Sequence, residues 1–166
     1  RSIISGMNEH QKRLLSLSPD YYPYIEPQPG AGRGLLQALA NRACIVVTDE
    51  SPVFFTPKLT ESARRLTCCR VEAVDSCGLL PIRVADRNFV SAYQFRRFLQ
   101  RMLPAHLEML PDPDPLPSAK IPSSPSIPRE IMEQWPKADA QLLQARGTLF
   151  SLPIDHSIGP TPWRGG

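Results

Sequence analysis

The sequence lacks the cysteine and histidine spacing of a zinc site, because it has no C-x-x-C pair and its three histidines are scattered. It also lacks any run of the ~18 apolar residues that a membrane span requires, and it shows no signal peptide. We therefore expect no metal ion, no membrane association and a cytoplasmic location. The cysteines are expected to be reduced thiols; they are Cys44, Cys68, Cys69 and Cys77.

A strong excess of charge of one sign is missing as well. The 166 residues carry a net charge of +3 and a sequence pI near 8.8. Dedicated nucleic-acid-binding domains usually exceed a pI of about 9 and cluster their basic residues. The net charge alone therefore does not predict nucleic-acid binding. The length and the apolar content of 42% suffice for one domain with a real core.

Proline, in contrast, is abundant, with 19 residues that are unevenly placed. Seven of them lie between Pro111 and Pro128, where the missing backbone donors and fixed φ angles favour an extended linker. The composition thus divides the chain into a domain at 1–110, a linker at 111–128 and a short helical tail at 129–166. Within the tail we predict helical pieces at Ile131–Trp135 and Ala138–Gln144, and a loop at Leu152–Gly166.

Strands alternate with helices in the first part of the chain. The runs at Cys44–Thr48 and Arg70–Val74 are typical of parallel strands that are covered on both faces. The β-rich segment Tyr21–Glu26 contains a proline, which favours an edge strand. The alternation predicts an α/β fold, a Rossmann-like open parallel sheet with flanking helices. Further elements are predicted as helices at 2–17, 35–42 and 89–103, a helix with Thr56 as N-cap and Pro57 as first residue, and a short strand at Leu80–Val84.

Each of the two central strand-like runs ends in an aspartate and breaks into a loop that a proline closes. The runs are CIVVTDESP at Cys44–Pro52, which contains Asp49, and VEAVDSCGLLP at Val71–Pro81, which contains Asp75. Ligands of open parallel sheets bind just beyond the carboxyl ends of the strands, so Asp49, Glu50 and Asp75 are candidate binding residues. Adjacent side chains at a strand end point apart, which disfavours a general acid/base pair. Alternatively, these carboxylates brace the loops by accepting backbone hydrogen bonds.

A glycine-rich loop, GAGRG at Gly30–Gly34, lies between a strand-like segment and a predicted helix. A Rossmann fold binds phosphate at such a place. The spacing here is G-x-G-x-G rather than G-x-G-x-x-G, and no Lys-Ser or Lys-Thr follows as in a Walker loop. The loop is interpreted either as a tight turn or as a phosphate site with Arg33 as the contact.

Arginines gather on the outer face of the predicted helix at 89–103. Arg96, Arg97 and Arg101 lie away from its apolar stripe, and Arg87 precedes it. They form either a solvated surface or a docking face for another domain or for DNA backbone phosphates. No Ser/His/Asp or Cys/His arrangement stands out, so no catalytic residue is predicted in this chain.

Several motifs follow one another in an order that is fairly specific. Val47–Asp49 is followed by Ser51-Pro52, and Val74-Asp75 is followed by Leu79–Pro81. In order and spacing these motifs resemble the N-terminal α/β domain of DNA photolyases, with the greatest likeness to a bacterial branch near the class II cyclobutane pyrimidine dimer photolyases. The resemblance covers roughly residues 3–166 and includes the helix with Tyr93, Arg96 and Arg97 and the tail Leu152–His156.

The resemblance implies a light-driven DNA-repair flavoenzyme. Members of the family bind reduced FAD in a separate all-helical domain, which passes an electron to the pyrimidine dimer after excitation. The α/β domain often holds an antenna chromophore and packs on the helical domain, so Asp49, Glu50 and Asp75 are candidates for contacts to either. The resemblance further implies that residues 129–166 lead to a helical FAD domain outside this chain. It also implies that the first strands of the family's sheet lie outside this chain.

We therefore expect that the chain alone does not repair DNA and is poorly stable in isolation. Two alternatives stay open. The chain is also compatible with a cryptochrome-like photoreceptor module without repair activity. It is further compatible with an unrelated nucleotide-binding α/β protein that uses the Gly30–Gly34 loop.

Overall fold

The computed structural model describes residues 2–17, 19–108, 110–122, 125–144, 148–157 and 159. The chain divides into two compact units, which we describe separately. Unit 1 comprises Arg1–Leu35 and Asp114–Gly166, and unit 2 comprises Leu36–Pro113. The first 35 residues therefore group with Asp114–Gly166, which include most of the proline-rich segment.

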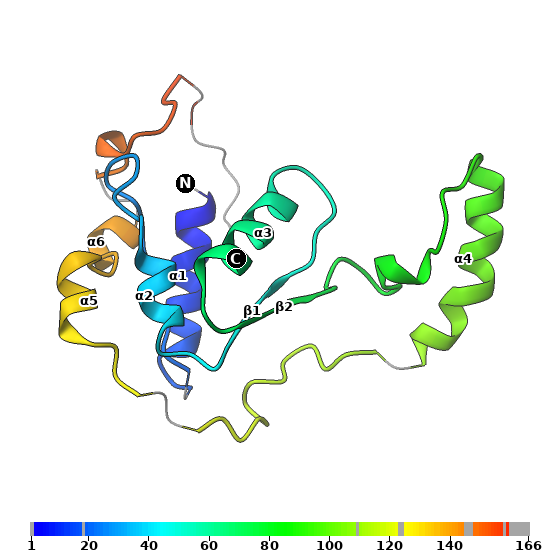
Figure 1. Ribbon diagram of the computed structural model, residues 1–166, viewed down its shortest axis with the longest axis horizontal. Coiled ribbons are helices and arrows are strands. Elements are labelled where there is room, and N and C mark those ends of the chain that lie inside the picture. The colour runs from blue at the N-terminus through cyan, green and yellow to red at the C-terminus, as the bar shows by residue number, and fades with distance from the viewer. Residues whose placement is uncertain are drawn as a thin grey trace. The chain divides into compact units, whose positions relative to one another are not determined.

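Unit 2 is built on a β-α-β unit (Figure 1). Strands β1 (Ile45–Asp49) and β2 (Arg70–Val74) are parallel neighbours, in a register that pairs Ile45 with Arg70 and Asp49 with Val74. Helix α3 (Thr56–Leu66) connects the strands and packs on β2. A crossover helix is the usual link between adjacent parallel strands. The predicted mixed α/β class with a parallel strand pair is thus confirmed, and both strands lie within one residue of their predicted positions.

Helix α4 (Ala92–Leu107) follows in the same unit. It starts where Ser91 adopts an extended backbone and its hydroxyl accepts a hydrogen bond from the Gln94 amide at 3.4 Å. An N-cap serine satisfies one of the backbone donors that a helix start leaves open. The helix passes through Pro104 and ends four residues later than predicted.

Unit 1 joins both ends of the chain. Helix α1 (Ser2–Leu14) packs on α6 (Ala140–Leu143), and their contact buries Ile4 and Leu143. Helix α5 (Arg129–Gln134) and the 3-10 turn η2 (Thr148–Ser151) also belong to this unit. Helix α2 (Leu35–Ala40) begins at the boundary of the units and otherwise belongs to unit 2. Ala138 belongs to the same core, and the partly buried residues that pack against it are Met7, Ile25, Leu142 and Leu152.

The proline-rich segment is irregular, as predicted: in its described residues, 111–122 and 125–128, there is no helix or strand. Helices are confirmed near 2–17, 35–42, 131–135 and 138–144. Of the predicted loop at Leu152–Gly166, residues 158 and 160–166 lie outside the described residues.

Two predicted strands are wrong. Tyr21–Glu26 does not join the sheet, because the carbonyl of the buried Pro23 accepts a hydrogen bond from the Ala138 amide at 2.8 Å. Leu80–Val84 contains the 3-10 turn η1 (Ile82–Val84), because the Ile82 amide donates to the Asp75 carboxylate. The predicted N-cap of α3 is also displaced by one residue, since Phe55 and not Thr56 precedes the helix.

The sheet is open on one side. Ile45 and Val47 of β1 are 40% and 60% exposed, whereas Val46 and Thr48 on the other face are half-buried. The expectation that this strand is covered on both faces is therefore wrong. The physical reason is that helices cover the faces of a parallel sheet, and among the described elements α3 is the helix with substantial contacts to the strand pair, which it makes with β2.

Candidate functional site

The loops that follow β1 and β2 are tied to each other. The register brings the carboxyl ends of both strands to the same edge of the sheet. The Ser76 hydroxyl donates to Asp49 Oδ1 at 2.7 Å, and the Glu50 amide donates to the Val74 carbonyl at 2.7 Å. The Cys77 thiol donates to the Glu50 carbonyl at 3.1 Å. The two motifs that end in aspartate thus form one interlocked structure.

The three candidate carboxylates all have internal partners in this structure. Asp75 accepts hydrogen bonds from the amides of Cys77, at 3.3 Å, and Ile82. Glu50 accepts three hydrogen bonds from the Arg83 guanidinium at 2.7–3.0 Å, which together with the charge of Glu50 raise the pKa of Arg83. These contacts match the interpretation that the carboxylates brace the strand-end loops.

A cavity of about 360 Å³ lies beside these loops. Its polar lining includes Glu50 and Arg83, which pair with each other, and Thr60 and Glu61 of α3. Hydrogen bonds from Arg64 and Arg65 lower the pKa of Glu61 from its ordinary value of 4.5 to about 2. Glu61 is therefore ionised at neutral pH and is unsuited to act as a general acid. Asp49 and Asp75 do not line this cavity.

The glycine-rich loop is folded against a tryptophan in unit 1. The Trp135 indole Nε1 donates to the Ala31 carbonyl at 3.0 Å, and its ring covers Gly34. The Gly32 amide donates to the Glu26 carboxylate at 2.9 Å, so an internal anion already uses a donor that a phosphate would need. Gly30 and Gly34 both have φ near +88°, which favours glycine. The contacts agree with a tight turn, and Arg33 lies over Gly30 on the exposed surface.

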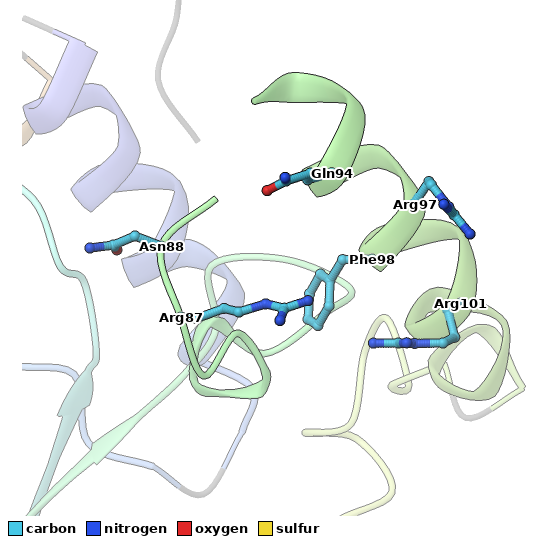
Figure 2. A pocket seen from close by; sticks show the side chains of 6 residues that line it. All are labelled: Arg87, Asn88, Gln94, Arg97, Phe98 and Arg101. Carbon is cyan, nitrogen blue, oxygen red and sulfur yellow. The ribbon is translucent and has the colours of Figure 1, made fainter. Parts of the chain in front are cut away.

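A second cavity, of about 470 Å³, lies in unit 2 and is rich in arginine. We call it the arginine cleft; its lining comprises Arg87, Asn88, Gln94, Arg97, Phe98 and Arg101. Figure 2 shows Arg87 reaching toward Phe98 from the segment before α4, and Arg101 reaching back from α4. Arg97 is displaced toward the outer side of the helix.

The structure thus groups the predicted arginines differently from the sequence. Arg97 joins Arg87 and Arg101 at the cleft, Arg96 is not part of its lining, and Arg33 belongs to unit 1. Arg97 and Arg101 are four residues apart, which is the spacing of neighbours on one helix face. Phe98, Asn88 and Gln94 were missed as site residues. The helical period places Gln94 and Phe98 beside these arginines, but nothing in the sequence shows that a cavity opens there.

The described residues contain no group of three or more histidine, cysteine or acidic side chains that suits a metal ion. The four cysteines are free thiols. In the part of the chain that the structure describes, no helix combines the length and apolarity needed to cross a bilayer.

Comparisons with known proteins give no relative for this chain. No protein-family model, no curated protein and no solved structure matches it.

Proposed function

We propose that the chain is the N-terminal α/β module of a light-dependent DNA-repair photolyase. The observation that supports this most is the interlocked pair of strand-end loops. The motifs that resemble the family, Val47–Asp49 with Ser51-Pro52 and Val74-Asp75 with Leu79–Pro81, lie at one edge of a parallel strand pair. Hydrogen bonds from Ser76 and Cys77 join the two motifs. These contacts offer a structural reason why the two motifs occur together in one sequence.

In this proposal the strand pair belongs to a Rossmann-like open parallel sheet. The unit β1-α3-β2 is the repeating element of such sheets. Two strands alone are at best marginally stable in water, so the proposal places further strands at the edges of this pair and a covering layer on the open face of β1.

The module has a structural and light-collecting role in this proposal. In the family, reduced FAD in the helical domain supplies the electron that splits the pyrimidine dimer, and we assign no catalytic residue to this chain. The cavity beside Glu50 and Arg83 is the proposed place for an antenna chromophore, at the strand-end position where open sheets bind ligands. Asp49 and Asp75 hold the neighbouring loops in place.

An exposed aromatic pair is the proposed contact to the helical domain. Phe54 and Phe55 follow the first motif and are 90% and 68% exposed, beside the half-exposed Val53. Phe54 has φ of 57°, a backbone region that bulky residues rarely adopt. Contiguous exposed apolar side chains commonly mark interaction sites, so this loop is a suitable docking element for a neighbouring domain.

The absorption spectrum of the purified full-length protein tests this proposal. A photolyase or a cryptochrome-like photoreceptor retains flavin and shows its absorption bands. A colourless protein that binds a nucleotide through its glycine-rich loop would instead support the unrelated nucleotide-binding alternative. A colourless protein without nucleotide binding would contradict both.

A further inference from the structure

The arginine cleft concentrates positive charge without an opposing carboxylate. Three of its six lining residues are arginines, and none of the six is acidic. No ion pair among the described residues involves Arg87, Arg97 or Arg101. In contrast, the arginines of α3 and Arg83 are neutralised by glutamates. Unpaired like charges around a cavity attract an anion, because field lines are focused there.

Aromatic rings, and not acids, position two of these arginines, Arg87 and Arg97. The guanidinium of Arg87 lies 5.7 Å from the centroid of the Phe89 ring, and that of Arg97 lies 5.9 Å from the Tyr93 ring. The Phe89 ring in turn packs at 4.9 Å on Phe98, which is 6% exposed. A guanidinium that lies over an aromatic ring keeps its N–H groups free for another acceptor. Because the ring already restricts the side chain, anion binding costs less conformational entropy.

We propose that the arginine cleft binds a phosphate group, with Arg87 and Arg101 as the principal ligands. Their planar guanidinium groups match the bidentate geometry of phosphate oxygens. The amides of Asn88 and Gln94 add neutral donors at the same cavity. Arg97 contributes charge from the outer side of α4.

The phosphate has two possible sources, a free nucleotide-like molecule or the backbone of a nucleic acid. The buried ring of Phe98 offers little surface on which a base stacks, so the phosphate carries the recognition in both cases. This inference rests on the cleft alone and does not depend on the proposed photolyase function.

Titration calorimetry of the full-length protein with inorganic pyrophosphate and with ADP tests the first source. Arg87→Gln and Arg101→Gln should each weaken binding by about tenfold or more, the usual effect of losing a charge-assisted hydrogen bond. Arg101→Lys keeps the positive charge but loses the forked pair of guanidinium N–H groups. Its affinity should therefore lie between those of the wild type and Arg101→Gln. Arg96→Gln is the matched control, because it removes one charge from the same helix outside the cleft and should leave affinity nearly unchanged.

Binding of a short DNA duplex, followed by fluorescence anisotropy at several salt concentrations, tests the second source. If the cleft holds a backbone phosphate, Arg101→Gln lowers the affinity for DNA. It also reduces the slope of the logarithm of the binding constant against the logarithm of the salt concentration by about one, and Arg96→Gln has a smaller effect. An effect in either titration supports phosphate binding and identifies its source. The proposal is overturned if the wild type binds neither probe. It is also overturned if Arg96→Gln weakens binding as much as Arg101→Gln while circular dichroism shows both variants folded.

Discussion

The indole ring of Trp135 determines which side chains the glycine-rich loop tolerates. A Cβ atom on Gly34 would lie 3.2 Å from Cζ2 of Trp135, at a backbone φ of +88°. Gly34→Ala should therefore lower the free energy of unfolding by more than about 1 kcal/mol, because the backbone is strained and the buried ring must shift. Urea denaturation of the full-length protein measures this change.

Gly78→Ala is the control for this variant. A Cβ atom at Gly78 has no neighbour within 4 Å, and its φ is not positive. Its effect should stay within about 0.5 kcal/mol. Equal losses of stability in the two variants would show that the loop is not fixed by Trp135.

Local side-chain roles were predictable from the sequence, whereas distant partners were not. The bracing role of Asp75 follows from its place between a strand and a proline, and its amide partners lie within seven residues. Arg83 reaches Glu50 over 33 residues, and Trp135 reaches Ala31 over 104 residues. Such pairs form only when distant segments of the chain fold against each other, and a local sequence pattern carries no information about that contact.

At the level of single elements, α3 carries a charge cluster that responds to acid. Glu61 accepts hydrogen bonds from Arg64 and Arg65, which hold its pKa at about 2 in the folded protein. Its ordinary value is 4.5, so the folded state is favoured by the ionised carboxylate above that pH. This contribution should be lost as the pH falls from about 4.5 to about 2. Because the Glu61 side chain is partly exposed and its charge is screened by solvent, the effect on stability should be small.

The carboxyl carbon shift of Glu61 in an NMR titration measures this pKa directly. The midpoint should lie well below that of an ordinary glutamate, and Arg64→Gln combined with Arg65→Gln should return it toward 4.5. Arg70→Gln, which disturbs the separate pair with Glu72, should leave it unchanged. A wild-type midpoint near 4.5 would contradict the cluster.

Helices and strands were predictable where one local rule dominated. The β-branched run at β1 and the spacing of apolar residues in α1 and α4 needed no distant information. Tyr21–Glu26 has β-forming residues, but Pro23 bonds to Ala138 from the distant tail. Tertiary contacts override a β propensity in this way, because that propensity mostly reflects the packing surface.

For the molecule as a whole, the open sheet predicts that the isolated chain has low stability against unfolding. Val47 and Val74 on the two strands are at least half exposed, and so are Phe54 and Leu59 nearby. Residues 1–166 alone should bind a hydrophobic dye such as ANS and unfold without a sharp transition on heating, because few of the described apolar side chains are buried and many are exposed. Differential scanning calorimetry with dye fluorescence measures both properties. A cooperative transition at high temperature without dye binding would contradict this prediction.

Light-dependent repair by the full-length protein is the most direct test of the proposed function. Purified protein is mixed with ultraviolet-irradiated DNA, and pyrimidine dimers are counted after illumination and after an equal time in the dark. The proposal predicts that dimers disappear in the light and persist in the dark. A flavin-containing protein that leaves the dimers intact under illumination would contradict it and favour the cryptochrome-like alternative.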